Sequence, residues 1–209
     1  ECHDGLLKSA EALPQHMPFE TGDCETCHLP HAAESKALLF EPVGTLCRNC
    51  HDVTASAPVG GSVHAPVQDG CIECHQPHAS ATSPFLLAPP RALCVTCHDS
   101  IGQQLDSEIV HPPAGEGCLT CHGPHSTPHP GLLLASGAAS CRAGQDADPA
   151  VYAEKHLGFA APTLDCRECH DPHASQMAGM LLPEVHMPFG SGDCTACHED
   201  RREGTGGAQ

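Results

Sequence analysis

The stretch that decides the fold is Cys24-Glu25-Thr26-Cys27-His28, a C-x-x-C-H pentapeptide. The same pattern returns at 47–51, 71–75, 94–98, 118–122, 166–170 and 194–198. In this motif two thiols add to the vinyl groups of a haem, and the adjacent histidine becomes the proximal ligand of the iron. Two intervening residues set the sulfurs apart by about the distance between the two attachment carbons of the porphyrin. The sequence therefore predicts several covalently attached haems.

Zinc ribbons and thiol redox sites also use C-x-x-C pairs, and disulfide frameworks are a further alternative. Here a histidine directly follows every C-x-x-C pair, which none of these alternatives requires, so the pattern favours haem c. The predicted attachment cysteines are Cys24, Cys27, Cys47, Cys50, Cys71, Cys74, Cys94, Cys97, Cys118, Cys121, Cys166, Cys169, Cys194 and Cys197.

An incomplete motif stands at the beginning of the sequence. Glu1-Cys2-His3-Asp4 matches residues 49–52, but its first cysteine would lie upstream of the supplied residues. We predict an eighth haem at Cys2 and His3, held by one thioether or completed by missing upstream residues. The alternative is a disulfide between Cys2 and Cys141, the two cysteines outside complete motifs. We favour haem because His3-Asp4 stays in register, which gives eight expected haems, seven of them on complete motifs.

The motifs alternate within a repeat of about 47 residues. Each copy carries H-x-P, then a first motif C-x-x-C-H-x-P-H, a pair of leucines, and a second motif L-C-x-x-C-H-D. The copies are 16–52, 64–99, 111–146 and a truncated 156–198. In the third copy Gly144 and Gln145 replace the second thiol and the histidine, so we predict no haem at Cys141. Such a period indicates one array of stacked repeats spanning 1–209, with a flexible tail at 203–209.

The composition offers little material for an apolar core. The 209 residues include 20 Gly, 20 Pro, five Phe, one Tyr and no Trp. The haems must therefore supply most of the buried apolar surface, and the apoprotein should be largely unfolded. We expect mostly irregular coil with a few short helices: one turn at each motif, one helix at 150–156 and another at 100–110.

The formal charge of −17 disfavours binding to nucleic acid or anionic lipid, and it favours solubility or a basic partner. No stretch approaches the roughly 18 consecutive apolar residues of a membrane span. Haem c is attached outside the cytoplasmic membrane, so the chain is expected to be exported, with its signal removed, to the periplasm or beyond the cell.

Eight of the 18 histidines are expected to be proximal ligands: His3, His28, His51, His75, His98, His122, His170 and His198. The sixth-ligand candidates comprise four histidines in the Pro-His position of the first motifs (His31, His78, His125 and His173) and five leading histidines before a motif (His16, His64, His111, His156 and His186). His129 alone has no place in the repeat.

Nine sixth-ligand candidates at repeating positions, beside eight expected haem irons, suggest bis-histidine coordination throughout. His31 cannot easily cross the plane of the haem held by His28, so a Pro-His histidine should ligate the iron of a neighbouring haem. Met17, Met177, Met180 and Met187 are too few to compete. All-histidine ligation implies low reduction potentials, because methionine is the axial ligand that raises them.

The repeated C-x-x-C-H-x-P-H and L-C-x-x-C-H-D blocks resemble the doubled-C-x-x-C-H multihaem cytochromes of metal-respiring bacteria. These include periplasmic decahaem electron carriers and extracellular cytochromes that polymerise into filaments. The resemblance implies an elongated, mostly coil protein wrapped around a chain of stacked haems. The missing half-units depart from a regular decahaem array. The incomplete first motif, and an end motif without its own Pro-His, suggest a filament in which neighbouring subunits complete these sites.

The expected function is electron transfer along the haems to other redox proteins or to mineral or electrode acceptors, without enzymatic activity. The alternative is a multihaem reductase of a small oxyanion such as nitrite. Such enzymes need an open iron site, often in a C-x-x-C-K motif, and the sequence contains none. A structural or metal-storing Cys/His protein is a third class, which the absorption spectrum of a reduced sample would separate.

Overall fold

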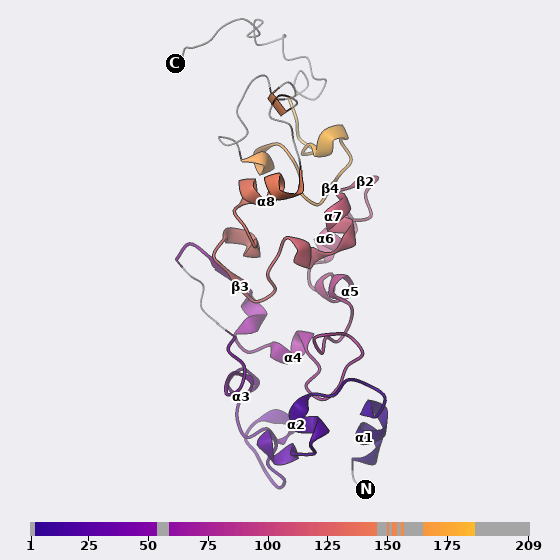
Figure 1. Cartoon of the computed structure of the whole chain (residues 1–209), viewed down its shortest axis with the longest axis vertical. Coiled ribbons are helices and arrows are strands. Elements are labelled where there is room, and N and C mark those ends of the chain that lie inside the picture. The colour runs from indigo at the N-terminus through magenta and orange to yellow at the C-terminus, as the bar shows by residue number, and fades with distance from the viewer. Residues whose placement is uncertain are drawn as a thin grey trace, which may run out of the picture. The chain divides into compact units, whose positions relative to one another are not determined.

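The described part of the chain consists of short helices and two-residue strands separated by coil (Figure 1). The computed structural model describes residues 3–53, 59–145, 150, 152–153, 156 and 165–186. The chain divides into two compact units. One comprises Glu1–Asp99 and Gly117–Leu134, and the other comprises Ser100–Glu116 and Ala135–Gln209.

The first unit contains the elements of the first two copies and the beginning of the third. They are α1 (Asp4–Ala10), α2 (Met17–Glu20), η1 (Cys24–Thr26), η2 (Lys36–Leu38), α3 (Val43–Arg48), β1 (Ser62–Val63), η3 (Ala65–Val67), α4 (Cys71–Cys74), α5 (Pro90–Cys94), η4 (Cys118–Thr120), β3 (Ser126–Thr127) and η5 (Pro130–Leu132). Prolines at the starts of α2, η3 and α5 suit the first helical turn, where no amide donor is needed.

The second unit contains α6 (Asp99–Gln104, beginning one residue before the unit), β2 (Ile109–Val110), α7 (Pro112–Glu116), α8 (Gly137–Gly144), η7 (Cys166–Glu168), β4 (Ala174–Ser175) and η8 (Ala178–Met180). The helix expected at 100–110 is correct only in its first half. The β-branched Ile109 and Val110 instead pair with β4, because an extended backbone is favoured before the prolines that follow His111. Of the helix expected at 150–156, Ala150, Tyr152 and Ala153 are helical, while 151 and 154–155 lie outside the described residues.

Antiparallel pairs connect each copy to the next one. The segment before a leading histidine pairs with the segment after the next Pro-His: Gln15 bridges Ala79, β1 pairs with β3, and β2 pairs with β4. The strands have only two residues each, so the ladders fix register between copies without forming a sheet that could support a core.

The polypeptide buries little apolar surface of its own. Among the described residues, the buried apolar side chains are Ala10, Val67, Ala79, Leu86, Leu105 and Ala174. Larger side chains such as Phe40 and Leu87 remain 40% and 51% exposed. This pattern matches the thin core expected from the composition.

A haem-free form of the protein is therefore expected to be unfolded. Replacing all motif cysteines with serine removes covalent attachment, and the remaining apolar contacts cannot offset the loss of chain entropy. Circular dichroism should then show a disordered backbone, and gel filtration an expanded chain. A cooperative thermal transition in this variant would contradict the expectation.

Candidate functional site

Each C-x-x-C-H motif in the described residues is built on one helical turn, as expected. In the first motifs, the histidine amide donates to the carbonyl of the first cysteine: His28 to Cys24 at 2.9 Å, His75 to Cys71 at 2.9 Å, His122 to Cys118 at 3.0 Å and His170 to Cys166 at 2.8 Å. Positions i, i+3 and i+4 share one face of a helical turn. Both thiols and the imidazole of a motif are therefore presented to the same side.

A turn nine residues further along orients the histidine of each first motif. The ring Nδ1 lies within hydrogen-bond distance of a backbone carbonyl: His28 to Ala37 O at 2.8 Å, His75 to Pro84 O at 3.0 Å, His122 to Gly131 O at 2.9 Å and His170 to Gly179 O at 2.7 Å. A carbonyl accepts, so Nδ1 must carry the proton. Nε2 is then the nitrogen available to a metal, and the ring orientation is fixed.

Left-handed backbone brings that carbonyl into place. The carbonyl residue has φ of 57° at Ala37, 68° at Gly131 and 71° at Gly179, and the following residue also has positive φ in all four copies. Non-glycine residues in this region are strained, and such strain concentrates at functional sites. This turn was not predicted from the sequence, although Gly131 and Gly179, each nine residues after a motif histidine, were its visible signal.

Exchanging alanine and glycine in this turn should change stability in opposite directions. Ala37→Gly removes the left-handed strain and is expected to stabilise the first copy by about 1 kcal/mol, whereas Gly131→Ala should destabilise the third by a similar amount. A methyl group at 131 meets nothing within 4 Å, so backbone strain alone sets the cost. Denaturant unfolding, followed by the haem absorption, measures the free energy of unfolding of both variants. If both substitutions changed it in the same direction, the left-handed backbone would not be the source of the strain.

The leading histidines of the first three copies are hydrogen-bonded to the Pro-His of the next copy. The backbone amides of His16, His64 and His111 donate to the carbonyls of His78, His125 and His173 at 2.8, 2.8 and 2.9 Å. Their Nδ1 atoms lie 3.1, 3.0 and 2.9 Å from the carbonyls of Pro77, Pro124 and Pro172. These leading histidines therefore also present Nε2.

The structure places imidazoles in facing pairs. Leading histidines face second-motif histidines of their own copy: His16 and His51 at 5.8 Å between ring centroids, and His64 and His98 at 5.9 Å. Pro-His histidines face first-motif histidines of the preceding copy: His28 and His78 at 6.1 Å, and His75 and His125 at 6.0 Å. Two metal–nitrogen bonds of roughly 2 Å, plus the radius of each ring, give a centroid separation of roughly 6 Å. The pairs therefore fit two axial ligands on one metal.

Burial supports the neutral form of the Pro-His ligands. Burial lowers the pKa of His78 below its ordinary value, and the nearby His28 and His16 lower it further. The pKa of His125 is lowered in the same way by burial and by His75 and His64. A neutral imidazole is the form that binds a metal.

The fourth copy departs from this pattern. His170 faces His156 at 6.1 Å, with ring planes 60° apart, whereas the planes of the other four pairs differ by 23° to 35°. His156 is oriented by a contact from Nδ1 to the carbonyl of Tyr152 at 2.9 Å, and its ring stacks on Tyr152 at 4.0 Å.

Thiols of successive motifs are neighbours. Burial raises the pKa of Cys47 to about 11, and the neighbouring thiol of Cys71 is the next cause. Burial likewise raises the pKa of Cys94 to about 11, with Cys118 as the next cause. Cys50 contributes to the raised pKa of Cys27, and Cys97 to that of Cys74. These are properties of the free thiols, since a thioether does not titrate. These mutual influences of the thiols indicate that attachment sites follow one another in chain order within the first unit.

The degenerate motif of the third copy keeps its backbone. The amide of Gln145 donates to the carbonyl of Cys141 at 3.1 Å, as in the complete motifs. Cys141 is a free thiol whose pKa is raised by burial and by the neighbouring Cys166. Position 145 nevertheless offers an amide in place of an imidazole, so the absence of a haem there stays a prediction. The alternative disulfide to Cys2 involves a cysteine outside the described residues.

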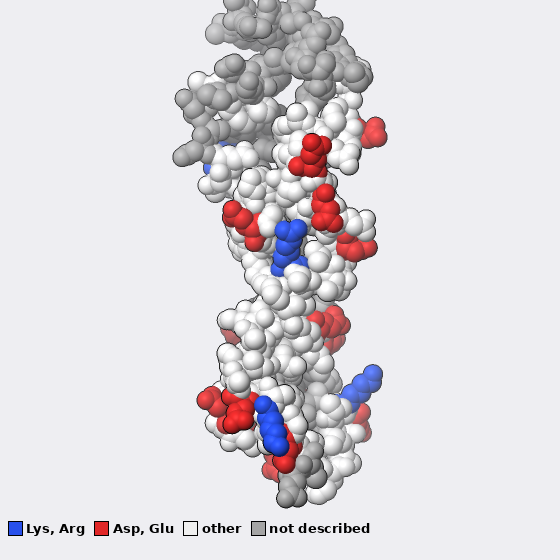
Figure 2. Space-filling model, turned by 90° about the vertical axis from the view of Figure 1, so that its right-hand side faces the viewer, with Lys and Arg blue, Asp and Glu red and all other residues white. Residues whose placement is uncertain are grey.

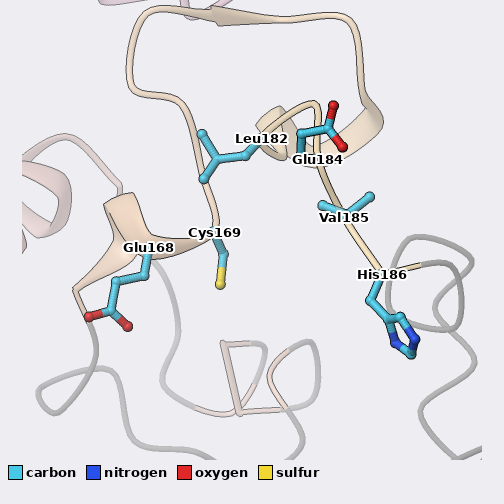
Figure 3. Close-up of a pocket in the computed structure, with 6 residues that line it drawn as sticks. All are labelled: Glu168, Cys169, Leu182, Glu184, Val185 and His186. Carbon is cyan, nitrogen blue, oxygen red and sulfur yellow. The ribbon is translucent and has the colours of Figure 1, made fainter.

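Some candidate residues are not brought together. His3 and His31 are exposed, and neither faces another imidazole among the residues that the structure describes. His186 lines a shallow hollow together with Cys169, Glu168, Leu182, Glu184 and Val185 (Figure 3). Its volume of about 220 Å³ is below the roughly 300–1,000 Å³ of typical ligand pockets. Cys194, Cys197 and His198 lie outside the described residues.

Paired thiols and a positioned imidazole on one helical turn, repeated along the chain, define a multihaem c-type cytochrome, a protein that transfers electrons. A family model described as the doubled CXXCH motif matches residues 16–56, 64–103 and 111–143, more than half of the chain. The chain therefore belongs to the doubled C-x-x-C-H family. A search of curated proteins found no match. Among the described residues, no helix is long and apolar enough to cross a membrane.

Proposed function

We propose that this cytochrome carries electrons along a row of seven or eight bis-histidine haems over long distances, outside the cytoplasm. A haem iron held by two imidazoles exchanges one electron at a time. The four facing imidazole pairs at 5.8–6.1 Å are the observation that supports this proposal most directly.

The chain's own residues perform three tasks in this proposal. The motif cysteines tether the haems at fixed positions. The carbonyls that contact Nδ1 orient the ligands and increase the basicity of the imidazoles, which favours low potentials. Histidines from two successive copies meet at one site, as His28 and His78 do, so that consecutive haems are held by a shared backbone.

Mass spectrometry and potentiometry of the purified holoprotein test the proposal. The mass should exceed that of the polypeptide by seven or eight haems. The ferric spectrum should be entirely low-spin, and reduction should span a range of low potentials. A substoichiometric high-spin haem that binds carbon monoxide would instead favour the alternative, a reductase of a small oxyanion such as nitrite.

A carrier role is favoured over catalysis by the ligand arrangement. A reductase needs an iron with an open position and acid or base groups around it. In each of the four near-parallel pairs, both axial positions have a positioned imidazole. The site chemistry thus supplies electron exchange and leaves no position for a substrate at these sites.

The surface suits a basic or mineral partner. Acidic side chains are scattered over the face shown in Figure 2, with few lysines or arginines among them. With a formal charge of −17, encounters with a basic redox protein would be accelerated at low salt. We place this encounter in the periplasm or outside the cell, where haem c is found.

A polymeric form would use the contacts that already connect successive copies. A Pro-His histidine faces an imidazole of the preceding copy in the His28–His78 pair, and His31 is an exposed histidine in the same sequence position. A copy from another chain could face His31 in this manner. Electron micrographs of concentrated holoprotein should then show filaments, and uniformly single particles would contradict a polymer.

A further inference from the structure

His111 is the leading histidine of the copy whose second motif is predicted to lack a haem. In the first two copies, the leading histidine faces the second-motif histidine, His51 or His98. The equivalent position of the third copy is Gln145, at the end of α8. An amide side chain is no substitute for the imidazole of a proximal haem ligand, and the preceding Gly144 removes one thioether. Loss of the site should have made a histidine at 111 dispensable as a ligand.

His111 nevertheless keeps both contacts of a leading histidine. Its amide donates to the carbonyl of His173 at 2.9 Å, and its Nδ1 lies 2.9 Å from the carbonyl of Pro172. These distances match those of His16 and His64 within 0.2 Å. Both acceptors belong to the Pro-His of the fourth copy. The side chain therefore holds the Pro172-His173 peptide in place although the haem that it would ligate is predicted to be absent.

Other contacts converge on the same peptide. Asp171 accepts a hydrogen bond from the amide of His173 at 2.8 Å, and Gln104 donates to Asp171 and to the carbonyl of Ala174. The β2–β4 pairing places Val110, next to His111, opposite Ala174. Ala174 and Ser175 are buried. The peptide that carries His173 is thus fastened from both sides, and Nδ1 of His111 provides the contact to Pro172.

We propose that His111 is a positioning residue: it orients His173 for axial ligation while ligating no iron itself. The inference rests on the proposed bis-histidine function. In the first two copies, the leading histidine both faces an imidazole as an axial ligand would and hydrogen-bonds the Pro-His of the next copy. In the third copy the haem of the second motif is predicted to be lost, and His111 retains only the hydrogen bonds to the Pro-His of the fourth copy.

Cyanide binding to the ferric holoprotein tests the role of His111. Cyanide enters a bis-histidine site only when an axial imidazole leaves, so its rate reports how firmly that ligand is held. His173→Ala should yield one high-spin haem per chain that binds cyanide at once. His111→Leu removes the side-chain contact and should make one haem bind cyanide roughly twofold to tenfold faster. His111→Asn can donate an amide hydrogen to Pro172 and should restore the original rate.

A control variant and several possible results decide whether His111 positions His173. His129→Leu, in the same copy but outside the repeat pattern, is the control and should leave all rates unchanged. Unchanged rates in His111→Leu, or a His111→Asn variant as fast as His111→Leu, would overturn the assignment. So would a fully low-spin His173→Ala protein, or acceleration in the His129 control. Failure of the proposed function is separate, because high-spin haem would then already be present before any substitution. Haem counts by mass confirm that each variant is fully loaded.

Discussion

Replacing His78 with alanine is expected to convert one low-spin haem per chain into a high-spin haem that binds carbon monoxide. His78 faces His28 across 6.1 Å, and its pKa is lowered by burial, so it is a neutral imidazole in place for ligation. Alanine leaves that position open. The ferric spectrum, together with carbon monoxide titration of the reduced protein, counts the affected haem against the total.

His78→Met is the matched variant for this substitution. A thioether can fill the vacated axial position, so this protein should stay mostly low-spin while the potential of one haem rises. His129→Ala, outside the repeat pattern, should change neither spin state nor potential. A His78→Ala protein without any high-spin haem would show that another side chain ligates this iron, and the facing pair would lose its assignment.

The sequence predicted the attachment chemistry and the repeat, but it could not pair the histidines. Because His28 blocks one face of its own haem, a Pro-His histidine had to reach a neighbour. The sequence did not say whether that neighbour belongs to the preceding or the following copy. The structure places His78 opposite the preceding copy. That choice depends on the antiparallel contacts between copies, and pairs of two-residue strands leave almost no periodic pattern in a sequence.

The turn that orients the first-motif histidines was hidden for another reason. Its carbonyl comes from Ala37, Pro84, Gly131 or Gly179 in different copies, so no single residue type marks it. The carbonyl acceptor and the positive φ of the residue that follows it are retained in all four copies, whereas the carbonyl residue varies and at Pro84 is not itself left-handed. A backbone function of this kind becomes visible only when positive φ and the hydrogen bond are seen together.

The second half of the helix expected at 100–110 is instead strand β2, and contacts with another segment explain this difference as well. Local propensity allowed a helix through Val110, but a helix there would remove the partner of Ala174 and Ser175, both of which are buried. The extended backbone also places Nδ1 of His111 within hydrogen-bond distance of the Pro172 carbonyl. A tertiary requirement thus overrides a weak local preference.

The haem expected at Cys166–His170 is predicted to be spectroscopically distinct from those of the four near-parallel pairs. Its facing imidazoles, His156 and His170, have planes 60° apart, whereas the other four pairs lie within 35°. Near-parallel imidazole planes split the iron d orbitals strongly, and planes far from parallel leave them closer in energy. Electron paramagnetic resonance of the ferric holoprotein should therefore show a highly anisotropic low-spin species from this haem, beside ordinary rhombic signals from the four near-parallel pairs.

Substituting His156 identifies the origin of that species. In His156→Ala the anisotropic signal should disappear, and one high-spin haem per chain should replace it, because His156 supplies the imidazole opposite His170. Tyr152→Leu is a milder companion change. It removes the ring that stacks on His156 at 4.0 Å but keeps the backbone carbonyl that accepts from Nδ1, so the haem should stay low-spin while its signal shifts. If the anisotropic signal persists in His156→Ala, a different haem produces it, and His156 is not the axial partner of His170.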